Sequence, residues 1–310
     1  MRAFIEELFN SPADVFFTSF LPKATSLRFK AFSGRVETCA IVNAKSGRCP
    51  SDCKFCAQSV HFKTRVTVYP LMTKEELKER ALAAFSKGID RFSFVTSGIA
   101  LSDRELSAVA SVVEELKSLN PEVKLCASLG QLGKEQLLLL KRSGLDRYHH
   151  NLETSKEFYP LIATRQSWHD RYKTVALAKE VGFSVCSGGI FGMGESAEDI
   201  CSIAESLAEL QVDSVPVNFL HPIRGTPLEG ARFLTPLKAL KVLVALRFLL
   251  PETSLRVCGG REFNLRELQP LSLLVSDSLM VGNYLTTKGR QLKDDAQMIK
   301  DLGLSSNLKP

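Results

Sequence analysis

Short apolar runs rich in Val, Ile, Leu and Phe alternate with longer stretches whose apolar residues recur every three or four positions. Runs of the first kind are typical of buried strands, and stretches of the second kind are typical of amphipathic helices. Strands are predicted at Glu37–Val42, Arg91–Thr96, Val123–Leu129, Arg147–Leu152, Phe183–Gly188, Ser214–Leu220, Ser254–Cys258 and Ser278–Tyr284. Helices are predicted at Thr73–Lys87, Asp103–Leu119, Lys134–Ser143, Arg171–Val181, Ala197–Leu210 and Pro236–Leu250.

The order of these elements predicts the fold class. Eight strands alternating with helices indicate an α/β fold, a parallel (β/α)8 barrel of the TIM type, and the strand count favours it over an open doubly wound sheet. Asp103 and Ser196 are predicted N-caps, and Gly88, Gly144 and Gly182 are predicted helix ends. No linker divides the chain, so we expect one domain over residues 1–310 with a helical extension at about residues 1–30.

Composition and charge argue against several classes of protein. The net charge is +6 with scattered basic residues, which gives little support for nucleic-acid binding. The longest apolar run, KALKVLVALRFLL, is short and is broken by Lys241 and Arg247, so no membrane span is expected. The N-terminal residues include acids where a signal peptide would be apolar. Eight cysteines without an export signal predict a reducing compartment, the cytoplasm.

Three cysteines crowd into the segment GRCPSDCKFCAQ, residues 47–58. Cys49, Cys53 and Cys56 have the spacing C-x3-C-x2-C, and thiolates are the usual ligands of iron–sulfur clusters. Three thiolates can hold three corners of a [4Fe-4S] cube and leave one iron open to another ligand. A zinc site is an alternative, but it normally needs a fourth ligand, and His61 does not have a familiar spacing for that role. Three ordinary buried cysteines fit poorly with so polar a segment.

With Phe55 before its last cysteine, this segment resembles the signature of the radical S-adenosylmethionine superfamily. Five segments in order resemble the biotin synthase family from about residue 30 onward, KSGRCPSDCKFCAQS, YHHNLETSKEFY, VCSGGIFGMGE, VPVNFLHPIRGTPLEG and LRVCGGRE. The resemblance implies a radical sulfurtransferase that inserts sulfur into dethiobiotin to form biotin. It implies that S-adenosylmethionine binds the open iron and yields a 5′-deoxyadenosyl radical, and that an auxiliary iron–sulfur cluster inside the barrel donates the sulfur.

The resemblance also assigns roles to residues. The expected catalytic, metal-binding residues are Cys49, Cys53 and Cys56. Contacts to S-adenosylmethionine are expected from Phe55, Ser97, Gly98, Asn151, Glu153, Arg171, Ile190 and Met193. Contacts to dethiobiotin are expected from His149, which stands where the family commonly has Asn, and from Asn151 and Asn218. Taken one at a time, each of these contact residues could be an ordinary turn, strand-end or surface residue. Together they occur at the carboxyl ends of predicted barrel strands, where active sites of such barrels lie, and this favours the functional interpretation.

The remaining cysteines differ from the family pattern. The family's usual auxiliary [2Fe-2S] cluster has three cysteines and an arginine as ligands, and this chain keeps Cys126, Cys186 and Arg256 but has Ser93 at the third cysteine position. Two further cysteines, Cys39 and Cys258, occur where the family usually has serine. We therefore expect Cys39, Cys126, Cys186 and Cys258 to bind an auxiliary cluster near Arg256, with four irons favoured over [2Fe-2S]. Alternatively, Cys39 and Cys258 are small buried hydrophobes, as Cys201 is expected to be.

The resemblance implies partners as well. It implies a low-potential electron donor of the flavodoxin or ferredoxin type, the iron–sulfur assembly machinery and a homodimer. A superfamily relative that inserts no sulfur, similar to hydrogenase maturases or methylornithine synthase, is the alternative enzyme. A non-enzymatic metal-binding or redox-sensing module is the alternative from another class, and it predicts no glycine-rich nucleotide site.

Overall fold

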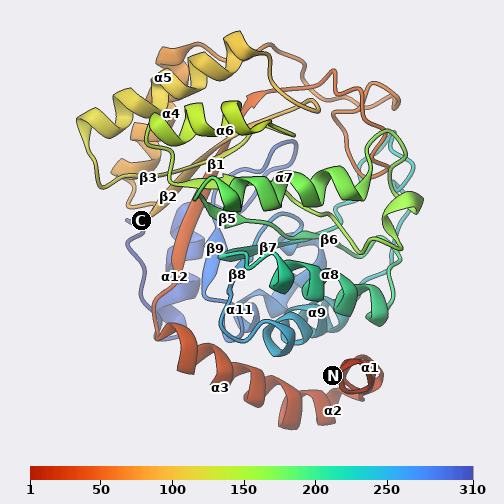
Figure 1. Ribbon diagram of the computed structural model, residues 1–310. Helices are drawn as coiled ribbons and strands as arrows, with labels where there is room; N and C mark the ends of the chain where they lie inside the picture. The colour runs from red at the N-terminus through yellow and green to blue at the C-terminus, as the bar shows by residue number, and fades with distance from the viewer. Residues whose placement is uncertain (310) are drawn as a thin grey trace.

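The computed structural model describes residues 1–309, and in this range nine strand segments form a closed parallel barrel inside a ring of helices (Figure 1). The strands are β1 (Glu37–Lys45), β2 (Arg91–Thr96), β3 (Lys124–Ser128), β4 (Arg147–His149), β5 (Ser184–Cys186), β6 (Gly189–Phe191), β7 (Ser214–Phe219), β8 (Ser254–Val257) and β9 (Ser278–Met280). Their order around the sheet is β5-β4-β3-β2-β1-β9-β8-β7-β6, and pairing of β5 with β7 closes it. The predicted (β/α)8 barrel is confirmed.

The extra segment is β6, which follows the predicted fifth strand, Phe183–Gly188, and lies outside the predicted strands; the structure has β5 within the predicted range and β6 directly after it. Both pieces pair with β7, through Cys186 to Ser214 and through Gly189 to Val217. Pro216 lies between these two points of β7 and has no N–H for a ladder hydrogen bond. A Cβ on Gly188 would collide with the carbonyl oxygen of Pro216, so the chain can pass this point only with glycine.

The main barrel helices lie close to their predicted positions. They are α4 (Lys74–Ser86), α5 (Asp103–Leu119), α6 (Lys134–Arg142), α7 (Trp168–Glu180), α8 (Ala197–Glu209) and α9 (Pro236–Leu249). The predicted cap at Ser196 is confirmed, but that at Asp103 is wrong, because Ser102 accepts the hydrogen bond from the Glu105 amide. Helix α7 begins three residues before the predicted start, because Ser167 caps it.

The chain begins with helices that lie outside the ring, along α8 and α9 (Figure 1). They are α1 (Arg2–Asn10), α2 (Ala13–Val15), a π-helical turn (Phe16–Phe20) and α3 (Leu21–Phe32). Lys241, which interrupts the apolar run of α9, donates to the carbonyl oxygens of Phe9 and Ser11 at 3.0 and 2.6 Å. The cation thus satisfies the end of α1.

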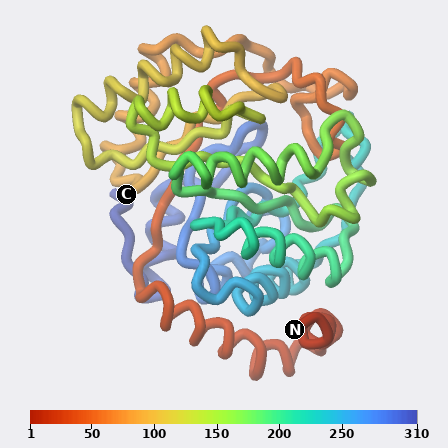
Figure 2. Tube along the Cα trace, in the orientation of Figure 1, coloured from red at the N-terminus to blue at the C-terminus, as the bar shows by residue number. Residues whose placement is uncertain are grey.

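Five shorter helical segments complete the fold. They are a 3-10 turn (Tyr159–Leu161), α10 (Arg261–Leu265), a 3-10 turn (Arg266–Leu268), α11 (Gln269–Ser272) and α12 (Leu292–Asp301). After α12 the chain returns to the amino end of the barrel, where Ser305 pairs with Gly34 and Val36, so that the last residues lie near β1, β2 and β3 (Figure 2).

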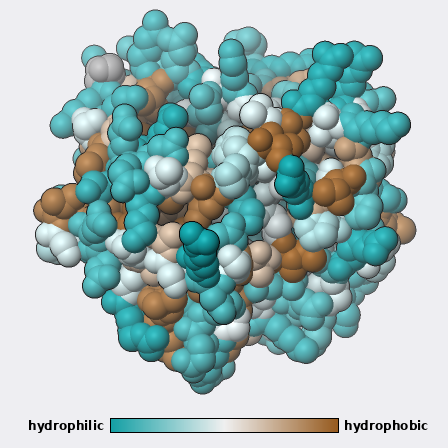
Figure 3. Space-filling view, turned by 90° about the horizontal axis from the view of Figure 1, so that it is seen from above, coloured by the Kyte–Doolittle hydropathy of each residue, from teal (hydrophilic) through white to brown (hydrophobic). Residues whose placement is uncertain are grey.

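The surface carries scattered apolar side chains. The face drawn in Figure 3 is mostly hydrophilic, and its apolar side chains lie in separate groups. Among residues 1–309 no helix is both long enough and apolar enough to cross a membrane.

Candidate active site

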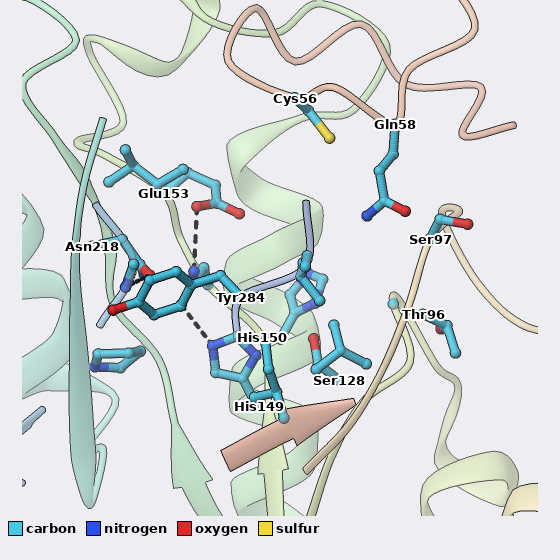
Figure 4. Close-up of a pocket in the computed structure, with 18 of the residues that line it drawn as sticks. Cys56, Gln58, Thr96, Ser97, Ser128, His149, His150, Glu153, Asn218 and Tyr284 are labelled. Carbon is cyan, nitrogen blue, oxygen red and sulfur yellow. Dashed lines mark hydrogen bonds between the residues drawn. The ribbon is translucent and has the colours of Figure 1, made fainter. Parts of the chain in front are cut away.

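A cavity of about 350 Å³ runs into the barrel from the carboxyl ends of the strands. Alternate residues of each strand face it, as the period of two in a strand requires. The strand residues that line it are Cys39, Ile41, Ser93, Val95, Thr96, Cys126, Ser128, His149, Cys186, Ile190, Pro216, Asn218, Arg256 and Met280. The cysteine loop that follows β1 covers its mouth, with Cys56 and Gln58 above and His149 and His150 below (Figure 4).

Internal hydrogen bonds shape the cysteine loop. The Gln58 side-chain oxygen accepts from the Ser46 hydroxyl at 3.1 Å and from the Gly47 amide at 3.0 Å. The Cys56 amide donates to the Cys53 carbonyl at 2.9 Å, which makes a tight turn between these two residues. These contacts direct Cys49, Cys53 and Cys56 toward the same cavity. Three thiols from one short loop have the number and type of donors that a cluster with one open iron requires.

Two thiols of the loop, those of Cys53 and Cys56, are held in the protonated form by burial. Burial raises the pKa of Cys53 and raises that of Cys56 to about 12. Since iron binds thiolates, loading this loop must release protons, and a cluster rather than a free thiolate is the stable charged form here.

A buried ion pair lies beside the loop. The Glu153 carboxylate and the Arg171 guanidinium approach to 3.4 Å, with side chains 12% and 10% exposed. Burial raises the pKa of Glu153, and Arg171 opposes that effect. Arg171 also donates to the Tyr159 hydroxyl, the Asn151 carbonyl and the Gln166 side chain, which leaves one of its five N–H groups for a ligand. Its position is therefore fixed before any ligand binds.

His149 and Asn151 form a chain with this ion pair. Asn151 accepts from His149 Nε2 at 2.9 Å and from the Gly188 amide at 3.2 Å, and it donates to Glu153 at 3.3 Å (Figure 4). Burial lowers the pKa of His149 to about 4, so the ring is neutral and its Nε2–H donates. Asn151 keeps one free N–H.

Asn218 lies on β7, across the Gly188–Gly189 segment from Asn151. Its Nδ2 donates to the Gly189 carbonyl at 3.2 Å, and its Oδ1 accepts from the Gly259 amide at 3.1 Å. One N–H and one lone pair remain for a ligand, which suits a group that both donates and accepts.

The glycine-rich segment after β5 differs from expectation. A Cβ at Gly189 would meet the Glu153 carbonyl, so this glycine allows close approach of protein backbone and not of a ligand. Ile190 lines the cavity, as does Phe55, but Met193 does not. Met193 is buried in a small apolar cluster with Ile162 and Leu220, against which Phe55 and Ile190 pack.

Ser97 and Gly98 line the cavity at the end of β2. The Ser97 hydroxyl donates to the Gly47 carbonyl at 2.7 Å and so ties β2 to the cysteine loop. Gly98 has φ +106°, a conformation that side chains disfavour. The segment can therefore present backbone groups to the cavity.

Of the four cysteines predicted to bind the auxiliary cluster, three line the cavity inside the barrel. Cys39, Cys126 and Cys186 are 3%, 3% and 2% exposed, and burial raises the pKa of Cys39 and that of Cys126, the latter to about 12. Ser93 pairs in register with Cys126. No three His, Cys, Asp or Glu side chains in the described part of the chain are arranged as ligands of a single metal ion.

Cys258 differs from expectation. The sequence predicts a strand that ends at Cys258 and a Cys258 thiol that binds the auxiliary cluster, but β8 ends at Val257 and Cys258 is not among the lining residues. Its thiol donates to the Arg256 carbonyl at 3.4 Å. Burial raises the pKa of Cys258, and Arg256 opposes that effect. The Cys258 thiol thus contacts the backbone of Arg256 and does not line the cavity, unlike Cys39, Cys126 and Cys186.

Sequence reasoning missed part of the cavity wall. His150 lines it, is 6% exposed and has an Nε2 atom without a hydrogen-bond partner. Tyr284, Thr286 and Thr287 line it from the loop after β9. The rule that carboxyl ends of barrel strands carry the site could have found this loop, since it follows the last strand.

The chain matches two family profiles. Residues 44–207 match the Radical SAM superfamily, and residues 216–305 match the Biotin and Thiamin Synthesis associated domain. The cysteine loop and the Glu153–Arg171 pair lie in the first region, and Asn218 and Arg256 lie in the second.

Curated relatives and solved structures agree with these matches. The chain is 49% identical to the biotin synthase of Pelotomaculum thermopropionicum over 87% of this chain and 84% of that one, and 46% identical to that of Aquifex aeolicus over 86% and 80%. Methylornithine synthase (19% identity, 99% and 94% of the two chains) has the same fold with a TM-score of 0.85. The [FeFe]-hydrogenase maturase of Carboxydothermus hydrogenoformans (17% identity, 98% and 75%) gives 0.84. On the identity and coverage of these relatives, the chain belongs to the biotin synthase family.

Proposed function

We propose that this chain is a radical S-adenosylmethionine sulfurtransferase that converts dethiobiotin to biotin, with Cys49, Cys53 and Cys56 as the ligands of its [4Fe-4S] cluster. One observation carries the proposal. Thiols from two levels of the barrel, the cysteine loop at the mouth and Cys39, Cys126 and Cys186 deeper inside, line the same cavity. A catalyst that forms a radical at one cluster and takes sulfur from another needs this arrangement, whereas the relatives without sulfur insertion do not.

The fit of the first cluster rests on the donor set and its surroundings. When bound, the cluster supplies the electron that cleaves S-adenosylmethionine. Glu153 and the free N–H of Arg171 offer an acceptor for ribose hydroxyls and a donor for the methionyl carboxylate. Phe55 and Ile190 offer apolar surface for adenine, and Ser97 and Gly98 offer backbone contacts. Met193 acts through the packing of Phe55 and Ile190, not by direct contact.

Dethiobiotin is proposed to bind between Asn218, Asn151 and His149, whose free donors and acceptors suit a cyclic urea. Asn218→Ala is expected to weaken dethiobiotin binding by about 1–3 kcal/mol, because the ureido edge would lose its partner in a buried pocket. Equilibrium binding of dethiobiotin and of S-adenosylmethionine to each protein measures this. S-adenosylmethionine affinity is the internal control, and an unchanged dethiobiotin affinity would contradict the role of Asn218.

The auxiliary cluster is proposed to be a four-iron cluster held by Cys39, Cys126, Cys186 and Cys258. The burial of the first three thiols around one cavity supports it. Cys258 is included because it is fully buried next to Arg256 and its pKa is raised by burial and also by Cys186 and Cys39. Cys258 must then turn from the Arg256 carbonyl toward the cavity when iron binds.

Iron analysis tests the auxiliary site. A full-length variant in which Cys49, Cys53 and Cys56 are all Ala is expected to retain about four irons per chain after anaerobic reconstitution. About two irons, with the spectrum of a [2Fe-2S] centre, would mean that the usual family cluster persists. Zinc in place of iron in the unaltered protein would contradict the whole assignment.

The partners are proposed from the same chemistry. The two clusters need a low-potential electron donor of the flavodoxin or ferredoxin type, and they need the iron–sulfur assembly machinery. We propose that the protein is a cytoplasmic homodimer and that each chain forms a single domain. Exposed Arg48 and Lys54 beside the cysteine loop would favour an acidic donor.

A further inference from the structure

Three arginines surround one carboxylate at the amino end of the barrel interior. Glu37 Oε1 on β1 lies 2.9 Å from Arg256 on β8, 3.3 Å from Arg91 on β2 and 4.0 Å from Arg147 on β4. The three arginine side chains are 3%, 7% and 11% exposed. We call these four residues the arginine cradle.

The charges of the arginine cradle do not balance. Three guanidinium groups against one carboxylate leave a surplus of two positive charges (3 − 1 = 2). Arg147 is the most exposed of the three arginine side chains, and even it is only 11% exposed, so solvent screens the surplus poorly. Buried like charges are costly, and a structural ion pair needs only one arginine.

One guanidinium nitrogen also has no partner. Arg91 Nη1 is buried and has no hydrogen-bond partner. The whole Arg91 side chain is only 7% exposed, so water has little access to this donor. Buried donors are nearly always satisfied, and an exception points to a group that is bound in the working protein. The surplus charge and the free donor together indicate an anion.

The thiols of the inner cavity lie directly beside the arginines. In the sheet register Arg91 pairs with Cys39, and Arg147 pairs with Cys126. The Nη1 atom of Arg256 lies 3.8 Å from Cys186 Sγ. Paired residues of adjacent parallel strands face the same side, so each guanidinium accompanies a different thiol on the inner face of the barrel.

We propose that Arg91 and Arg147 act with Arg256 and Glu37 as positioning residues for the auxiliary cluster, matching its negative charge and raising its reduction potential. The inference rests on the four-iron cluster proposed above. A four-iron, four-sulfide core with a formal charge of about +2 and four thiolates has a net charge of about −2, which the surplus of the cradle balances. Nearby charge and N–H donors to sulfur set the potential of such clusters. The arginines thus favour the reduced, more negative form.

The test is a redox titration of the variant that lacks Cys49, Cys53 and Cys56, so that only the auxiliary cluster responds. Arg147→Gln in this background is expected to lower the midpoint potential. The ratio of oxidised to reduced cluster at fixed potential should change about tenfold, equivalent to about 59 mV for a one-electron couple. Arg147→Lys keeps the charge and is expected to retain most of the parent potential.

Lys124→Gln is the matched control. Lys124 is exposed and pairs with Arg91 at the start of β3, so this change removes one charge from the same end of the barrel, but one that solvent screens. An equal shift for Arg147→Gln and Lys124→Gln would overturn the role of the cradle.

Iron content separates the remaining outcomes. A parent variant that binds no iron would overturn the proposed auxiliary cluster, and the cradle with it. Loss of iron in Arg147→Gln but not in Arg147→Lys would support the cradle, because the charge would then be needed for binding itself. Loss of iron in both would show that Arg147 serves only to fold this end of the barrel, and the inference would be wrong.

Discussion

Replacing Cys53 with Ala is expected to abolish formation of 5′-deoxyadenosine. Cys53 is the middle cysteine of the loop, is 6% exposed and lies 3.3 Å from the Ser51 hydroxyl. A cluster with two remaining thiolates cannot keep its open iron in a fixed position. Chromatography of anaerobic reactions with S-adenosylmethionine, dethiobiotin and a strong reductant measures the nucleoside.

Cys201→Ala provides the matched control for this variant. Cys201 lies on α8, is 1% exposed and packs in the main core away from the cavity. Its loss removes one thiol without touching either proposed cluster, so deoxyadenosine should form at the parent level. Substantial deoxyadenosine from Cys53→Ala would refute the assignment of the cysteine loop.

Replacing Asp295 with Ala is expected to destabilise the fold by about 3–5 kcal/mol. Asp295 on α12 and Arg261 on α10 form an ion pair at 2.7 Å, with side chains 0% and 1% exposed. Removing the carboxylate leaves the buried guanidinium with only the partly exposed Glu262 carboxylate, at 3.5 Å, as a counter-charge. Losing the fully buried partner costs far more than losing an exposed one would. Arg261 also donates to the Tyr284 hydroxyl at 3.1 Å, so the cavity wall should loosen as well. Urea unfolding of the anaerobically purified protein measures the change.

Asp294 provides the control at the neighbouring position of the same helix. It is only partly buried and its side chain makes no ion pair among residues 1–309, so Asp294→Ala should change stability by no more than about 0.5 kcal/mol. Equal losses from the two substitutions would mean that the buried pair with Arg261 has no special importance.

The barrel could be predicted because its signals are local. Alternation of apolar runs with amphipathic stretches and the glycines after helices place most elements within a few residues of their observed bounds. The break between β5 and β6 could not be predicted, because it depends on Pro216 of another strand. The shift of the α5 cap from Asp103 to Ser102 is a one-residue choice between two good caps.

The site could be predicted in type but not in detail. The spacing of Cys49, Cys53 and Cys56 indicates a cluster from the sequence alone, because one short loop supplies all three thiols. The arrangement of Glu37 with three arginines is invisible in the sequence, since the four residues come from four strands and meet only when the barrel closes. The orientation of Cys258 likewise depends on where β8 ends.

The first and last strands of the chain, β1 and β9, pair with each other, although they are synthesised far apart in time. Glu37 on β1 and Ser278 on β9, which pair in register, are 241 residues apart. At a ribosomal rate of about 5–20 residues per second, β1 emerges roughly 10–50 s before its partner and stays an open edge during that interval. Such an edge can pair with other nascent chains, so a chaperone that shields it should raise the yield of soluble protein. The same interval is when Cys39, Cys126 and Cys186 are open to solvent, before closure leaves them at most 3% exposed. The speed of translation therefore sets how long these three thiols stay accessible in a partly built barrel.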